Sequence, residues 1–194
     1  MANANTPMGL KPIRHKNGGC YEGQANLYHV RSDYATALFI GDPVIVTGNA
    51  DVKGVPDVQI ATAGATNKIT GVIVGFKPNP TNLELKHGPA STDRYVLVCD
   101  DPSVIFEVCT DATANVAATD VSTNINFAAG SGGSTATGKS SWVAATTSMA
   151  ADATYQGTIE RIVNREDNEI GTAYTKLEVS INLHQKMSYA IAGI

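Results

Sequence analysis

The sequence predicts an all-β protein: a small β-barrel or β-sandwich of short antiparallel strands with long loops and an extended N-terminal arm. Its strongly periodic segments have period 2. In LEVSINLH, residues 177–184, apolar and polar side chains alternate as they do along a half-buried strand. Clusters of Gly, Pro, Asn and Asp separate such segments, which is typical of sandwiches and barrels. No segment has the sustained 3.6-residue periodicity and caps of a long helix.

The first 24 residues are expected to form an extended arm ahead of the β domain. Prolines at 7 and 12 oppose helix formation, and glycines at 9, 18 and 19 discourage packing. Strands are then predicted over 25–30, over GDPVIVTGN at 41–49 and over KITGVIVGF at 68–76. A long loop is expected at 77–93, where KPNPTNLELKHGPASTD is rich in polar and turn-forming residues.

The centre of the chain, RYVLVCDDPSVIFEVC at 94–109, predicts a hairpin, because two β-rich runs flank an Asp-Asp-Pro-Ser turn. In that hairpin Cys99 lies at the turn and Cys109 at the far end, roughly 15 Å away, whereas a disulfide needs Cα atoms within ~7 Å. We therefore expect two unpaired thiols, each buried as a small hydrophobic side chain. Asp100 and Asp101 are interpreted as turn formers.

The second half of the chain begins with a segment, 111–149, dominated by Ala, Thr, Ser, Asn and Gly, with apolar pieces at 125–127 and 142–143. One or two turns of helix fit 146–155. A closing hairpin is predicted from TYQGTIERIVN and YTKLEVSINLHQ on either side of REDNEIGTA, residues 165–173. We expect a single β domain at 25–194 after the arm at 1–24, with one further subdivision: a small barrel around 35–110 and a second β-layer from 111–194.

Composition narrows the classes of function. The 194 residues carry a net charge of −4, and no basic stripe is visible, so nucleic acid is not expected as the main partner. No apolar run approaches the ~20 residues of a membrane span. Three cysteines without metal spacing, and a start without an apolar signal core, predict synthesis in a reducing cytoplasm. Charged residues make up 16%, against about 25% in ordinary domains, which suits a protein packed against other subunits.

Two chemical motifs were weighed against structural explanations. GSTATGKS, Gly133–Ser140, matches the phosphate-binding P-loop, but that loop needs a helix after it, and the β-branched SWVAATTSMA is a poor helix former. The four histidines are far apart in sequence, and His184 is expected to face solvent or a neighbour. We therefore predict no enzyme: no catalytic, cofactor-binding or metal-binding residue is nominated, and no cofactor is expected. The role of the Gly/Ser/Thr-rich segment 129–141 stays open.

Three stretches resemble the head decoration, or capsid cement, proteins of tailed phages. MGLKPIRHKNGG, at 8–19, is similar to the opening arm of that family, and RYVLVCDDPSVIFEVC to its central hairpin. IVNREDNEIGTAYTKLEVSINLHQ, at 162–185, is similar to its closing hairpin, although the family usually has Arg-Pro where Arg165 is followed by Glu166. The resemblance covers both ends and the middle of the chain, and 112–153 aligns least.

The resemblance implies a virion structural protein on the outer capsid surface, made in the host cytoplasm. Such a protein binds the exterior of an assembled icosahedral capsid and stabilises contacts between major capsid subunits, often as a homotrimer. The implied partners are the major capsid protein and further copies of the chain. The arm, with apolar anchors, cations and prolines that hold it extended, supplies the candidate capsid-binding residues Pro7, Leu10, Lys11, Pro12, Ile13 and Arg14. The alternatives are another virion component, such as a tail or major shell subunit, and a P-loop nucleotide-binding protein.

Overall fold

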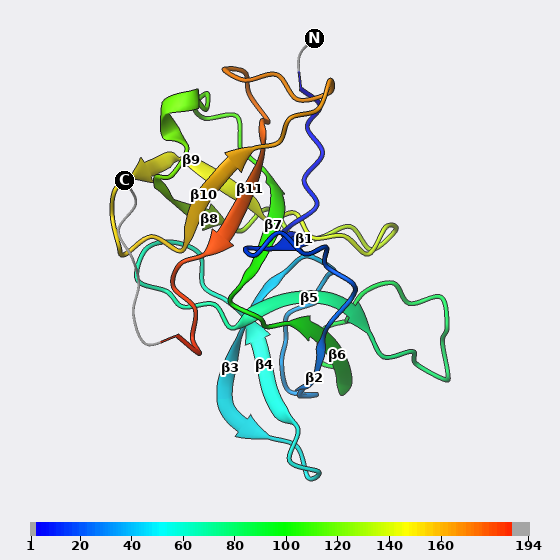
Figure 1. Cartoon of the computed structure of the whole chain (residues 1–194). Helices are drawn as coiled ribbons and strands as arrows, with labels where there is room; N and C mark the ends of the chain where they lie inside the picture. Colours follow the sequence, from blue (N-terminus) through cyan, green and yellow to red (C-terminus); the bar gives the residue numbers. More distant parts are fainter. Residues whose placement is uncertain (1–2, 188–194) are drawn as a thin grey trace.

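A computed structural model describes residues 3–187, and it confirms the all-β fold class (Figure 1). Eleven strands form a closed five-stranded barrel and a six-stranded sheet in a sandwich-like arrangement. The described residues contain one short 3₁₀ helix, η1 (Ala118–Asp120), and no α-helix, so none of them forms a helix long and apolar enough to cross a membrane. Residues 1–2 and 188–194 lie outside the described residues.

The barrel uses strands β2 (Asn26–Val30), β3 (Pro43–Ala50), β4 (Pro56–Ile60), β5 (Gly71–Phe76) and β6 (Arg94–Cys99). They close in the order β2-β4-β3-β5-β6, and every pair is antiparallel except β2–β4. Alternate apolar side chains fill the interior, as period 2 requires: Tyr28, Val30, Leu38, Val44, Val58, Ile73, Val96 and Val98. The predicted strands at 25–30, 41–49 and 68–76 all lie in this barrel.

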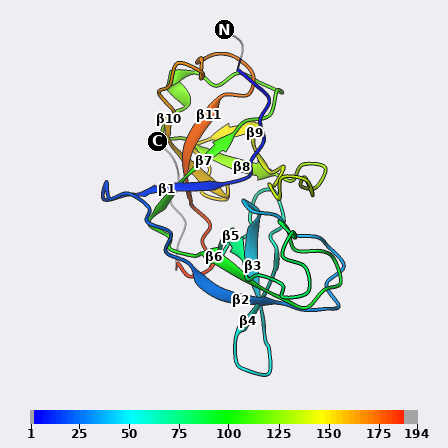
Figure 2. The same ribbon diagram turned by 90° about the vertical axis from the view of Figure 1, so that its right-hand side faces the viewer.

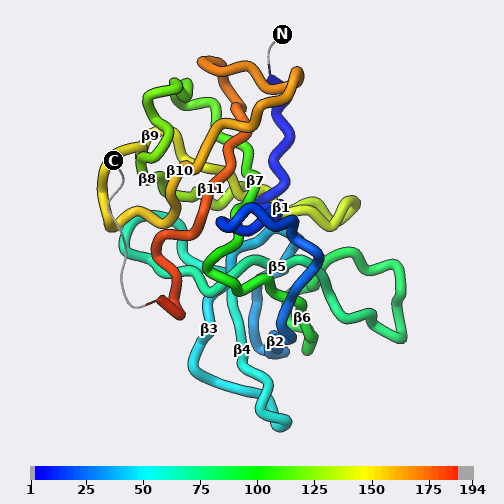
Figure 3. Tube along the Cα trace, viewed as in Figure 1, coloured from blue at the N-terminus to red at the C-terminus, as the bar shows by residue number. Residues whose placement is uncertain are grey.

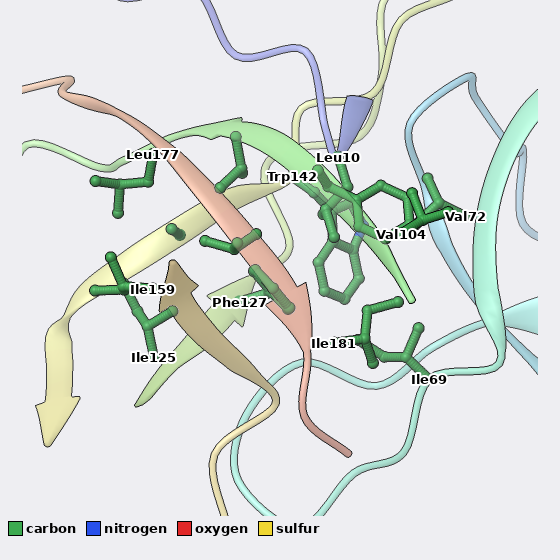
Figure 4. Close-up of a cluster of buried hydrophobic side chains, with 14 of the residues drawn as sticks. Leu10, Ile69, Val72, Val104, Ile125, Phe127, Trp142, Ile159, Leu177 and Ile181 are labelled. Atoms are coloured by element: carbon green, nitrogen blue, oxygen red, sulfur yellow. The ribbon is translucent and has the colours of Figure 1, made fainter. Parts of the chain in front are cut away.

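The six-stranded sheet uses β1 (Lys11–His15), β7 (Val104–Cys109), β8 (Asn124–Ala128), β9 (Val143–Ala150), β10 (Gly157–Ile162) and β11 (Lys176–Ile181). Its order is β1-β7-β11-β10-β8-β9. The inner face buries Phe106, Phe127 and Trp142, and this core continues onto Val72 and Cys99 at the outside of the barrel wall. Figure 4 shows Phe127 and Trp142 among the side chains gathered at the sheet, with Val72 of the barrel wall beside them.

The predicted central hairpin is wrong. β6 pairs with β2 and β5, whereas β7 pairs with β1 and β11, so residues 100–103 lead from the barrel into the other sheet. Asp101 still forms the turn, since its Oδ1 accepts a bond from the Ser103 N–H at 2.8 Å. Cys99 and Cys109 are unpaired and buried as expected, and burial raises the pKa of the Cys99 thiol to about 11. All six residues of β7 are buried, which a two-stranded hairpin could not achieve.

The N-terminal residues are not a separate arm. β1 is an edge strand paired with β7, and Leu10 is fully buried in the core of the sheet. At the start of the described chain, the Asn3 side chain exchanges two hydrogen bonds, of 2.7 and 2.9 Å, with the backbone of Glu169. Figures 2 and 3 show this stretch running beside the sheet to β1. The barrel therefore spans 26–99 rather than about 35–110, and the second layer includes β1 and β7 as well as residues after 111.

The C-terminal half follows the prediction more closely. β10 and β11 form the predicted closing hairpin, and the apolar pieces at 125–127 and 142–143 belong to β8 and the start of β9. No helix forms at 146–155, because β9 extends to Ala150 beside β8. His184 is buried, not exposed as expected, since the chain after β11 folds back against Ile69 of the barrel.

Candidate functional site

One strand from each of the stretches 8–19, 94–109 and 162–185 lies in the six-stranded sheet, whereas the other strand of 94–109, β6, lies in the barrel. The three stretches contribute β1, β7 and β11, which lie side by side, although long segments of chain separate them in sequence. A row of four charged side chains crosses these strands and β10, each opposite the next: Lys11, Glu107, Glu178 and Arg161. Their neighbours along the strands, such as Phe106 and Val179, point into the core, so this row lies on the outer face of the sheet.

Arginines neutralise the two adjacent carboxylates in this row. Like charges directly opposite each other destabilise a sheet, so Glu107 beside Glu178 needs compensation. Arg165 donates two bonds to Glu107, at 2.9 and 3.2 Å. Arg14 donates two bonds to Oε2 of Glu178, at 2.6 and 3.1 Å, and Arg161 lies 3.4 Å from the same oxygen.

The cations of this network lie nearer to solvent than the anions. The Glu107 and Glu178 side chains are 7% and 14% exposed, whereas those of Arg165 and Arg161 are 43% and 61% exposed. The bonds to Glu107 also raise the pKa of Arg165, which keeps its charge. The buried carboxylates thus hold the guanidinium groups in place, and these groups direct N–H donors outward. We call this surface, made of Lys11, Arg14, Lys16, Arg161 and Arg165, the cationic face; a face of this kind fits carboxylates on a partner.

The structure brings together only part of the predicted site. Lys11 and Arg14 lie on the cationic face, and Pro7 is exposed beside it in sequence. Pro12 and Ile13 are half-buried. Leu10 cannot anchor a partner from the conformation described, because its side chain is part of the core. Sequence reasoning missed the two glutamates and the arginines of β10 and its loop, since strand register, which no single strand reveals, places them together.

A groove lies where the N-terminal residues cross the barrel. Its volume is about 480 Å³, and it is lined by Met8, Leu10, Lys11, Pro12, Tyr21, Ile40, Gly41, Ile73, Val74 and Lys139. Most of this lining is apolar, and the exposed residues Lys11 and Lys139 bring two ammonium groups to it. The groove therefore combines a surface for apolar side chains with a preference for negative charge.

The P-loop match does not have the structure of a P-loop. The segment after Ser140 leads into β9, a strand, so no helix N-terminus faces the loop. The backbone of the match is used to attach it to the barrel: the Ser140 N–H donates to Ile40 at 2.8 Å, and the Ile40 N–H donates to Gly138 at 2.8 Å. The Ser140 hydroxyl accepts a bond from the Trp142 N–H at 3.1 Å.

A second cluster of charge lies on the barrel. The Nδ1 of His29 is 2.6 Å from Oδ1 of buried Asp57, and its Nε2 bonds to Asp93, which is mostly exposed. Burial lowers the pKa of His29, but the bonds to both carboxylates outweigh it, and the net shift is upward. We call His29, Asp57 and Asp93 the His29 latch, because their bonds join β2 to β4 and to the loop before β6. Within residues 3–187, no group of three His, Cys, Asp or Glu side chains is arranged to hold a metal ion.

The cationic face presents guanidinium and ammonium groups on a paired β-sheet. Such a surface binds acidic partners by preformed donors, and its affinity falls as salt rises. Comparison with protein-family models, with curated proteins and with solved structures finds no match for this chain.

Proposed function

We propose that this protein is a virion structural component that binds the exterior of an assembled icosahedral capsid and stabilises contacts between major capsid subunits. One observation carries the proposal: the three stretches that resemble decoration proteins form adjacent strands and place Lys11, Glu107 and Glu178 in one row on one face. None of these stretches carries a catalytic motif, so a shared surface is the feature that can give them a common function. The same resemblance implies association of copies, as a homotrimer.

The cationic face is the attachment surface in this proposal, in place of a free arm. The sheet already holds Arg14, Arg161 and Arg165, so docking orders few additional side chains and loses little conformational entropy. Its partner is a patch of carboxylates on the shell, because the five cations of the face outnumber the four carboxylates beside them, Glu107, Glu178, Glu160 and Asp167. Electrostatic attachment of this kind supplies orientation and specificity as well as affinity.

Co-sedimentation with undecorated shells tests this function. A variant with Lys16→Ala and Arg161→Ala removes two exposed cations of the face, and the matched control is Lys53→Ala with Lys68→Ala, two exposed lysines elsewhere. We expect the face variant to bind about two- to thirty-fold more weakly, because each exposed ion pair contributes about 0.2–1 kcal/mol. Equal losses in both variants would contradict the cationic face as the attachment surface.

Imaging of particles with and without the protein separates the virion alternatives. Extra density on the outer shell supports the decoration role. Density confined to the tail would replace it with the tail-component alternative.

A further inference from the structure

The groove beside β1 and the loop between β10 and β11 complement each other in apolar character and charge. The groove has the volume of a ligand-binding pocket, apolar walls from Met8, Ile40 and Val74, and Lys139 at its margin. The loop, 163–175, carries Ile170, which is 53% exposed, together with the exposed acids Glu166 and Glu169. An apolar side chain flanked by carboxylates is the chemistry that an apolar groove with two lysines accepts.

Hydrogen bonds fix the backbone of the loop that carries the exposed Ile170. The Nδ2 of buried Asn168 donates to Val163 at 2.7 Å and to Lys176 at 3.0 Å, and its Oδ1 accepts from the Lys176 N–H at 2.8 Å. The paired bonds between Asn3 and Glu169 fix the loop from the other side. Because the backbone is already fixed, the Ile170 side chain loses little conformational entropy when it binds.

The groove is equally preformed. The N–H of Leu10 donates to the Gly41 carbonyl at 2.9 Å, where two backbone segments cross with no room for a side chain. A Cβ at Gly9 would lie 2.4 Å from that carbonyl oxygen, and both glycines have positive φ, of +69° and +96°. The crossing therefore fixes the wall of the groove without an occupant.

We propose that Ile170 of one copy docks in the groove of a second copy, with Glu166 facing Lys139. The loop lies at the end of the sheet remote from the barrel, whereas the groove lies at the junction of β1 with the barrel (Figures 1 and 2). The contact is therefore heterologous, and it generates a ring if the rotation closes and an open chain if it does not. The proposal rests on the proposed function only in that this function implies association of copies.

Disulfide trapping in the free protein tests the contact. In a Cys20→Ser background, which removes the exposed thiol, one chain carries Ile40→Cys in the groove and the other carries Ile170→Cys. We expect a mixture under mild oxidation to give about tenfold more linked heterodimer than the control pair, a difference that corresponds to about 1.4 kcal/mol. In the control, Val52→Cys at the fully exposed tip of the β3–β4 hairpin replaces Ile170→Cys. Equal linking in the two mixtures would overturn the proposal.

Charge reversal provides a second, independent measurement. We expect Lys139→Glu in the groove chain to reduce linking several-fold, and Glu166→Lys in the loop chain to restore it. If the yield of linked heterodimer is the same with and without these changes, the assigned contact is contradicted. If Ile40→Glu abolishes shell binding while the free chains never link, a shell subunit occupies the groove and the proposal is wrong. Linking that persists while the parent protein does not bind shells, or while the cationic-face variant binds them as well as the parent does, would instead point to failure of the proposed function alone.

Discussion

The barrel and the six-stranded sheet bury their cores in different ways. The barrel is made from one continuous stretch, 26–99, and its eight core side chains are enclosed by its own strands. The sheet is open, and its core includes Val72 and Cys99 from the outer wall of the barrel. A closed barrel supplies its own opposite wall, whereas an open sheet needs a second layer. We therefore expect a one-way dependence: the stability of the sheet depends on the barrel more than the stability of the barrel depends on the sheet.

The largest effect is expected from Phe106→Ala in the core of the sheet. Removing this fully buried ring should lower the free energy of unfolding by about 3–5 kcal/mol. If the dependence runs one way, amide exchange should accelerate in β8, β10 and β11 while β3 and β4 keep their protection. Uniform loss of protection in both regions would show a single cooperative unit.

The converse substitution, Ile73→Ala in the barrel core, should cost about 2–5 kcal/mol. Here we expect protection to fall in both regions, because the sheet loses the wall on which it packs. Amide exchange measured on both variants gives the comparison directly. Retained protection in β8 and β10 would show that the sheet is self-sufficient and would break the proposed dependence.

Gln156, buried just before β10, connects the two regions. Its Nε2 donates to Thr62 at 2.9 Å and its Oε1 accepts from the Gly64 N–H at 2.9 Å, both in the connection between β4 and β5. Gln156→Ala removes the hydrogen-bond partner of these two backbone groups and should lower the free energy of unfolding by about 1–3 kcal/mol. Urea unfolding should then broaden or split, since the connection weakens. The exposed Gln59→Ala is the matched control and should lie within about 0.5 kcal/mol of the parent protein.

The His29 latch allows the barrel to be perturbed by pH. Its pKa is raised in the folded protein, so its stabilisation is complete below the unfolded value and is lost as pH rises through the folded value. We expect the parent protein to exceed His29→Gln in stability by about 1 kcal/mol at low pH, because one partner, Asp93, is mostly solvated, and to lose that advantage in alkali. Thermal unfolding at several pH values measures the difference. An advantage that grows with pH would contradict the sign.

The smallest effect is expected at the P-loop match. Lys139 is exposed, so Lys139→Ala should change the free energy of unfolding by no more than about 0.5 kcal/mol. Saturable binding of Mg-ATP that this substitution abolishes would contradict the structural interpretation and revive the nucleotide-binding alternative.

Local sequence predicted most of the strands, but it missed β1, β4 and the end of β9. Alternation in KLEVSI and turn residues in REDNEIGTA predicted the β10–β11 hairpin, because register in a hairpin follows from its loop and its buried face. The all-β class and the buried, unpaired Cys99 and Cys109 followed from the same local patterns. The β-branched residues after the P-loop match predicted that no helix follows it, and strand β9 follows it in the structure.

Tertiary structure decided which strands became neighbours. The turn at 100–103 has the same local chemistry whether it closes a hairpin or leads into a second sheet, so β6 and β7 were assigned to each other wrongly. Leu10 became core, and Glu107 came to lie beside Glu178, for the same reason. Period and turn chemistry act over a few residues, whereas pairing depends on which distant strands bury the most apolar surface together, and that is a property of the whole chain.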